Sequence, residues 1–150
     1  MKAAVPCKRR TVRALAAAGA LAVLGACSSM PGMMSMYSQS VALAGSNEVP
    51  PVSTPASGSG TVTIRPDMTV SAKITVTGMT ATAAHIHQAA AGANGPVVVP
   101  FTKTADNTFE APSGAKLTEA QYAAYKAGNL YVNVHSAAHP GGEVRAQLRP

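Results

Sequence analysis

The chain has 150 residues, a formal net charge of +6 and two cysteines. Five of its twelve Lys and Arg residues lie within the first 13 positions, so the rest carries seven basic and six acidic residues. That remainder is nearly neutral, which argues against binding of nucleic acid or an anionic membrane through its charge. Its length suits one domain with a hydrophobic core of its own.

The N-terminus has the pattern of a bacterial export signal. Its basic residues precede an apolar stretch at 14–24, which is too short to span a bilayer. The stretch ends in Leu24-Gly25-Ala26-Cys27, which resembles the lipobox of bacterial lipoproteins. This resemblance implies cleavage before Cys27 and a diacylglyceryl group and acyl chains on that residue, which together anchor a protein stably to a membrane. We therefore expect residues 1–26 to be a signal peptide.

The residues around the lipobox bear on export and destination. Arg9-Arg10 raises the twin-arginine route, although Thr11-Val12-Arg13 matches its usual continuation poorly. Ser28 is not aspartate, and by resemblance to the sorting rule of enteric-type bacteria this favours the outer membrane, facing the periplasm. Cys7 leaves with the signal and Cys27 is expected to be lipidated, so no disulfide is expected in the mature chain.

Residues 27–40 are rich in Met and Ser and are predicted to be a tether. They lack hydrophobic periodicity and contain a Pro-Gly break. Four of them are methionines, at positions 30, 33, 34 and 36. We favour a flexible spacer, and a thioether site for Cu(I) is the alternative.

The globular domain is expected over residues 41–150, mostly as short strands. Strands are predicted at 61–64, 69–76, 83–87, 96–101, 130–135 and 143–148, several of them with alternating apolar and polar residues. One helix is predicted at 119–127, because Thr118 and Gln121 form a capping-box pattern and Gly128 follows. This pattern predicts an all-β fold, an antiparallel β-sandwich or open barrel with one short helix.

Four stretches, in order, resemble the CHRD domain, the module named after chordin and common in secreted bacterial proteins. They are residues 43–52 (LAGSNEVPPV) with 58–60 (GSG), 84–87 (AHIH) with 92–98 (GANGPVV), 117–118 (LT) with 128–135 (GNLYVNVH), and 140–145 (PGGEVR). Ala146 and Ser136 stand where the family commonly has glycine and threonine, which are small departures. The resemblance implies an all-β module outside the cytoplasm, with no established enzymatic reaction.

Histidines are the candidate ligands of a metal ion. His85 and His87 lie two apart in a predicted strand and should share one face. His135 shares its strand face with Tyr131 and Asn133 rather than with apolar residues. Three imidazoles suit copper or zinc and leave an open coordination position. His139 lies in a Pro-Gly-Gly turn and is expected to be a solvated loop residue.

The same histidines also fit a hydrogen-bonded network without a metal. In that arrangement the imidazoles form hydrogen bonds with Asn133, Glu143 and Arg145. Glu48 pairs with Arg145 or holds a histidine in position by a hydrogen bond. Three functions therefore stay open: a lipid-anchored module of the cell envelope that holds copper or zinc, a structural or protein-interaction module, and a metal-dependent redox enzyme. The enzyme is the least favoured, and the protein partner is unknown.

Overall fold

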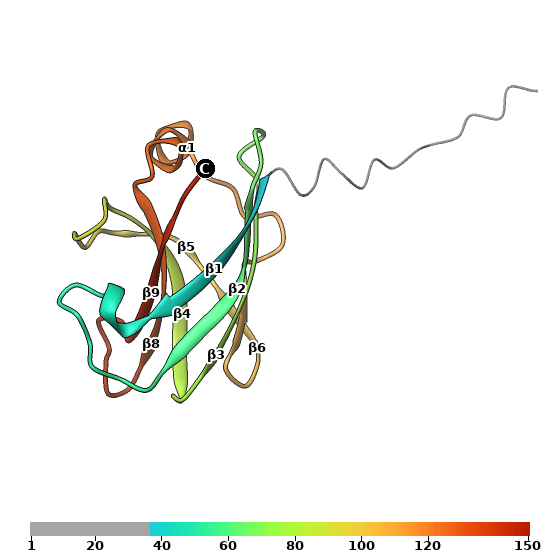
Figure 1. Cartoon of the computed structure of the whole chain (residues 1–150). Helices are drawn as coiled ribbons and strands as arrows, with labels where there is room; N and C mark the ends of the chain where they lie inside the picture. The colour runs from blue at the N-terminus through green and yellow to red at the C-terminus, as the bar shows by residue number, and fades with distance from the viewer. Residues whose placement is uncertain (1–36) are drawn as a thin grey trace, which may run out of the picture.

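The computed structural model describes residues 37–150, and the predicted signal peptide, Cys27 and the four tether methionines lie outside them. These residues form one antiparallel nine-stranded sheet with one α-helix, which confirms the predicted all-β class (Figure 1). The strands are β1 (Ser38–Ala44), β2 (Ser57–Ile64), β3 (Val70–Thr77), β4 (Ala81–Gln88), β5 (Val97–Pro100), β6 (Thr102–Ala105), β7 (Thr108–Glu110), β8 (Leu130–Ser136) and β9 (Val144–Leu148). The helix is α1 (Glu119–Lys126), and a short 3₁₀ turn, η2 (Gly45–Asn47), follows β1.

The sheet curls into a nearly closed barrel. Its strand order is β5-β4-β8-β9-β1-β2-β3-β7-β6, so β5 and β6 form the two edges. These two strands are consecutive in the chain and are separated only by Phe101. The backbone N–H of Phe101 donates to the carbonyl of Ala84 on β4 (3.0 Å). One continuous stretch of chain therefore leaves one edge of the sheet and joins the other.

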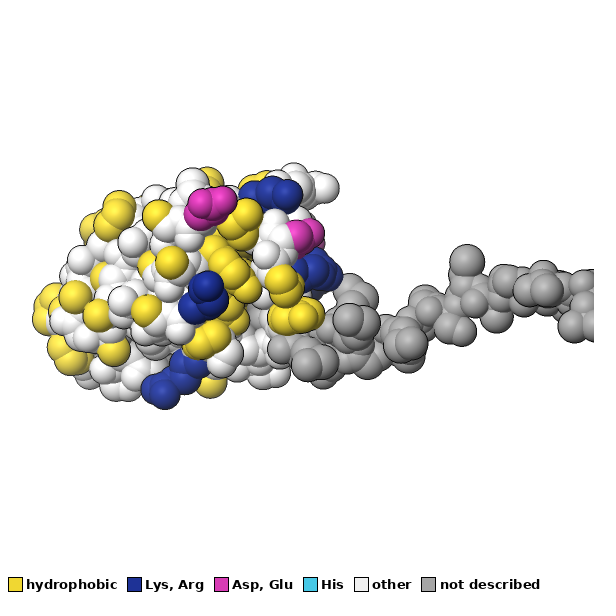
Figure 2. Space-filling model, turned by 90° about the horizontal axis from the view of Figure 1, so that it is seen from above, with side chains coloured by type: hydrophobic (Ala, Val, Ile, Leu, Met, Phe, Trp, Pro, Cys, Tyr) yellow, Lys and Arg dark blue, Asp and Glu magenta, His cyan; other side chains and the backbone are white. Residues whose placement is uncertain are grey.

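The two ends of the barrel differ. One end carries α1, the C-terminus and the start of β1, and the other carries the β3–β4 and β8–β9 turns (Figure 1). Figure 2 looks onto the first end, where a few charged side chains lie among hydrophobic ones and none of the visible, described atoms belongs to a histidine. Within residues 37–150, no helix is long and apolar enough to cross a membrane.

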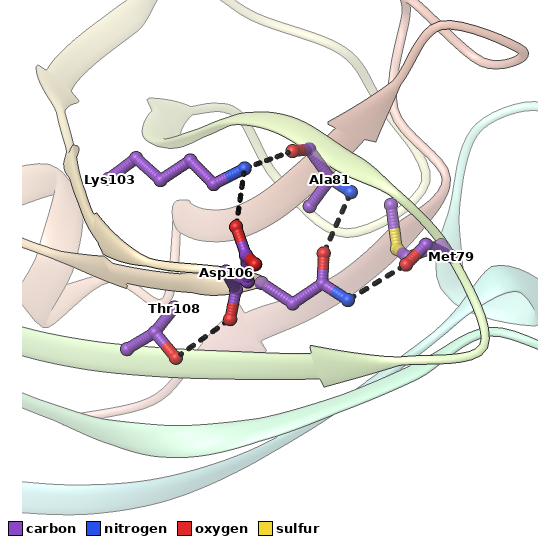
Figure 3. Close-up of polar contacts among 6 residues, drawn as sticks. Met79, Ala81, Lys103, Asp106 and Thr108 are labelled. Carbon is purple, nitrogen blue, oxygen red and sulfur yellow. Dashed lines mark hydrogen bonds and ion pairs between the residues drawn. The ribbon is translucent and has the colours of Figure 1, made fainter.

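Polar contacts fasten the β6–β7 turn to the start of β4 (Figure 3). The side-chain amide of Asn107 donates to the carbonyl of Met79 (2.9 Å) and accepts from the N–H of Ala81 (3.0 Å). The Lys103 ammonium donates to the carbonyl of Ala81 (3.3 Å). These bonds join backbone groups at the start of β4 to side chains of the β6–β7 hairpin, so they help to close the barrel.

Alternate residues of the longer strands fill the barrel interior. On β8, Leu130, Val132 and Val134 are completely buried, and Val144 and Leu148 on β9 pack beside them. Period-2 alternation places the residues between them on the outer face. The predicted strands over residues 69–76 and 130–135 therefore have the faces that the sequence indicated.

The predicted helix and its capping box are confirmed. The Gln121 N–H donates to the Thr118 hydroxyl (3.2 Å), and the Thr118 N–H donates to the Gln121 side chain (2.8 Å). Gly128 has φ +74° just after the helix, in the left-handed region that favours glycine. Tyr125 is buried and packs the helix against the barrel.

Some boundaries differ from the predicted ones. β1 begins at Ser38, inside the segment assigned to the tether, and β9 begins at Val144 rather than at Glu143. β6 and β7 were not expected at all. All four residues of β6 are exposed, so its sequence carries no apolar alternation by which a strand is recognised.

Candidate metal centre

A polar cluster lies on the outer face of β4, β8 and β9. The strand register places His85 opposite Asn133 and His87 opposite Tyr131, and Asn133 in turn lies opposite Arg145. This neighbourhood of strands is the one the histidine hypothesis required. Although the cluster lies outside the barrel, Asn133 and Arg145 are each only 1% exposed. Side chains and backbone from the connecting segments cover it, as the contacts below show.

His85, His87 and His135 come together as predicted. One ring nitrogen of each lies within 4.8 Å of the others. His85 Nδ1 lies 3.0 Å from His135 Nε2, at hydrogen-bond distance. His87 and His135 are buried and His85 is half-buried, so the group opens to solvent on the His85 side.

Backbone carbonyls fix the tautomers of two of these rings. His87 Nδ1 lies 2.9 Å from the carbonyl oxygen of Gly95, and His135 Nδ1 lies 3.0 Å from that of Pro140. A carbonyl oxygen only accepts, so each Nδ1 carries the proton and donates it. In the neutral rings each Nε2 therefore carries a lone pair; that of His135 accepts from His85 Nδ1, and that of His87 has no partner among the described residues. Metal-binding histidines are oriented in the same way, by a hydrogen bond from the ring nitrogen that does not bind the metal.

Burial lowers the pKa of all three histidines. The pKa of His85 falls to about 4, first through loss of hydration and then through the neighbouring His135 and His87. Burial also lowers the pKa of His87 and His135, while their bonds to Gly95 and Pro140 act in the opposite direction. All three rings are therefore neutral at pH 7, which is the form that binds a metal ion.

Glu48 and Asn133 lie beside the histidines. Glu48 is 5% exposed, and burial raises the pKa of its carboxyl group, although the Arg145 charge and the Asn133 amide lower it. The Asn133 side chain also raises the pKa of His87. Even so, Glu48 Oε1, His87 Nε2 and Asn133 Oδ1 are buried without a hydrogen-bond partner in the part of the chain that the structure describes.

Arg145 is a fully buried cation that organises the segment between β4 and β5. Its Nη2 donates to the carbonyl of Ala93 (2.9 Å), and its Nη1 donates to the Asn94 side chain (3.2 Å). The guanidinium carbon lies 3.4 Å from the centre of the Tyr131 ring, a cation–π contact. The Tyr131 ring also stacks parallel to the His87 ring, with ring centroids 4.9 Å apart.

Two of the expected pairings do not form. Glu143 accepts hydrogen bonds from the hydroxyls of Thr54 (2.7 Å) and Ser136, rather than from histidines. Glu48 and Arg145 form no ion pair, although each charge shifts the pKa of the other. Arg145 contacts Tyr131 and the 88–96 segment, and its charge lowers the pKa of His87. His139 is partly exposed in its turn, away from the three grouped rings.

Sequence reasoning missed Tyr131, Gly95, Pro140 and Gly142 as parts of the site. Tyr131 carried a signal, because it shares a strand face with Asn133 and His135. The carbonyl groups of Gly95 and Pro140 carried none, since every residue has a carbonyl. Gly142 lies in the Pro-Gly-Gly turn, a pattern that by itself predicts only turn geometry.

An open groove of about 850 Å³ lies next to the cluster, where β1 and β9 pair only through Ala44 and Arg145. No histidine lines it. The Asn94 amide donates to the carbonyl of Val49 (2.7 Å) and joins the two segments that border it. Glu48 and Arg145 of the cluster line the groove, so it borders the cluster, although none of the three grouped histidines lines it.

The sequence comparison agrees with this geometry. The CHRD domain family matches residues 39–148, a range that contains all of the barrel except the first residue of β1, and every residue of the cluster. No curated protein and no solved structure matches the chain significantly. Because the match covers most of the sequence, the chain belongs to the CHRD domain family.

Proposed function

We propose that this CHRD domain is a metal-binding module of the bacterial cell envelope. It binds one copper or zinc ion through His85, His87 and His135, and a lipid on Cys27 anchors it to the membrane. The observation that carries the proposal is the grouping of three imidazole nitrogens within 4.8 Å. Imidazole suits both metals, and a three-histidine site needs only small side-chain shifts to bring its nitrogens to bonding distance of about 2.0–2.1 Å.

The protonation pattern of the rings supports a metal ion more strongly than the presence of three histidines does. His87 and His135 each have an Nε2 lone pair, because a backbone carbonyl holds the proton on Nδ1, and that of His135 accepts from His85. His87 Nε2 has no partner among the described residues, so a metal ion would satisfy a group that is costly to leave unpaired. His85 is the adjustable ligand, since it must give up its hydrogen bond to His135 and can turn toward solvent.

A structural role for the histidines is the second candidate. The bond between His85 Nδ1 and His135 Nε2 favours it, because it is what a metal-free network would contain. That network leaves His87 Nε2 without a partner, whereas the metal site accounts for all three rings. For this reason we prefer the metal site.

Isothermal titration of the metal-free mature protein with Cu²⁺ and Zn²⁺ tests the proposal. We expect one site of micromolar or tighter affinity, and a loss of at least about 100-fold, roughly 3 kcal/mol, in His85→Ala and His135→Ala. His139→Ala is the matched control, because this histidine lies in the neighbouring turn outside the group. Binding that is absent, or that persists unchanged in both variants, would leave the structural role standing.

A further inference from the structure

The buried, unpartnered atoms of the described residues all belong to one neighbourhood. They are Glu48 Oε1, His87 Nε2 and Asn133 Oδ1. The Asn133 side chain is near both of the other groups, as its effects on their pKa values indicate. A Cβ atom built on Gly142 would lie 2.5 Å from Glu48 Oε1 and 2.5 Å from Asn133 Nδ2, which places these two side chains over the same glycine.

With the Glu48 carboxyl group ionised, which the Arg145 charge favours, all three atoms are acceptors, so they cannot satisfy one another. A carboxylate oxygen and an amide oxygen accept hydrogen bonds, and His87 Nε2 carries a lone pair because Nδ1 donates to Gly95. Leaving such groups buried and unpaired is costly. Their common partner must therefore be electropositive: a cation, or a molecule with two or more donors.

Building on the metal site proposed above, we propose that Glu48 and Asn133 hold the ligand that completes the metal coordination, a water molecule. Its oxygen binds the metal ion held by the three histidines. Its two O–H groups donate to Glu48 Oε1 and Asn133 Oδ1. The metal satisfies His87 Nε2, and the water satisfies the two oxygens, so one occupant accounts for all three atoms.

This arrangement defines which small molecules can replace the water. Two acceptors, one of them a carboxylate, face the fourth ligand, so a neutral ligand with N–H or O–H donors fits. An anion without donors meets two oxygen atoms and a like charge, which disfavours its binding. The fourth position therefore selects water or a neutral amine over azide or a halide.

Azide titration of the copper-loaded mature protein, followed by its visible absorption, tests this selection. We expect azide to bind weakly to the wild type and at least about tenfold more tightly to Glu48→Gln, which removes the like charge and supplies an amide donor. Glu143→Gln is the matched control, since Glu143 is also a buried glutamate but is bonded to Thr54 and Ser136. Its azide affinity should equal that of the wild type.

A second measurement needs no variant. The Cu²⁺ electron paramagnetic resonance lines of the wild type should broaden in ¹⁷O-enriched water, because the fourth ligand exchanges with solvent. Lines that do not broaden, or equal azide affinity in the wild type and in Glu48→Gln, overturn the water site and leave the histidine site standing. A wild type that takes up no metal overturns both proposals.

Discussion

Gly142 allows the turn after β8 to close over the polar cluster. It is buried and has φ +130°, a backbone conformation that side-chain-bearing residues rarely adopt. The missing Cβ also leaves the space that Glu48 and Asn133 occupy. The neighbouring Gly141 has neither property, because a Cβ there would meet nothing within 4 Å. Two adjacent glycines therefore serve different purposes.

We expect Gly142→Ala to lower the free energy of unfolding by about 2 kcal/mol or more, through backbone strain and the displacement of Glu48 and Asn133. Gly141→Ala should stay within about 0.5 kcal/mol of the wild type. Urea unfolding of the two variants at one pH measures the difference. Equal stabilities would mean that the turn can move away from the cluster at little cost.

At the scale of elements, strands with regular alternation were predictable and the segments that cover them were not. Alternation identified the faces of β3 and β8 and grouped the three histidines, because the side-chain period of a strand is two residues. It could not show that Gly95 and Pro140 would orient two of those rings, since this depends on how the loops return over the sheet. It could not find β6 either, whose four residues are all exposed.

The side chain of Asn107 holds the β6–β7 hairpin against the start of β4. Asn107 has φ +55° and makes two side-chain bonds to the β3–β4 connection. Asn107→Gly keeps the backbone conformation and removes both bonds, so we expect a loss of about 1–3 kcal/mol in unfolding free energy. Asp106→Asn is the control, because the exposed Asp106 carboxylate lies 3.9 Å from Lys103 and such pairs contribute little. Similar melting curves for the two variants would contradict this role.

At the scale of the whole molecule, the end of the barrel at which β1 begins sets where the candidate metal site lies relative to a membrane anchor. β1 begins at the same end of the barrel as α1 and the C-terminus (Figure 1). His135 lies near the end of β8, next to the turn at the opposite end. His85 and His87 lie opposite Asn133 and Tyr131, nearer the start of β8, so the histidine group lies along the side of the barrel rather than at either end. A membrane anchor that precedes β1 would therefore leave the side of the barrel that carries the histidines open to the surrounding compartment.

The anchor itself is testable directly, and Cys27 lies outside the described residues. We expect the wild type to incorporate radiolabelled palmitate and to sediment with membranes after cell lysis. Cys27→Ala should do neither, because the lipobox pattern provides a single acceptor thiol next to the cleavage site. Cys7→Ala is the control, since that cysteine lies within the predicted signal peptide. Equal labelling of wild type and Cys27→Ala would contradict the lipoprotein assignment.

The buried histidines also link the stability of the whole domain to pH. An unfolded histidine has a pKa near 6.5, whereas that of folded His85 falls to about 4 and those of His87 and His135 are lowered. Between these values the unfolded chain binds more protons than the folded one. The stabilising contribution is therefore fully present above about pH 6.5 and is lost as the pH falls toward 4.

We expect the metal-free wild type, kept in a chelator, to lose unfolding free energy more steeply between about pH 7 and pH 4 than His85→Gln does. Glutamine keeps a polar side chain at this position but does not titrate. Glu143 and Asp67, whose pKa values are lowered, also destabilise the fold on acidification, but they do so equally in both proteins and cancel in the comparison. His139→Gln should follow the wild type. Parallel curves for wild type and His85→Gln would mean that His85 titrates as a solvated histidine, and the metal affinity would then fall near pH 6.5 rather than at lower pH.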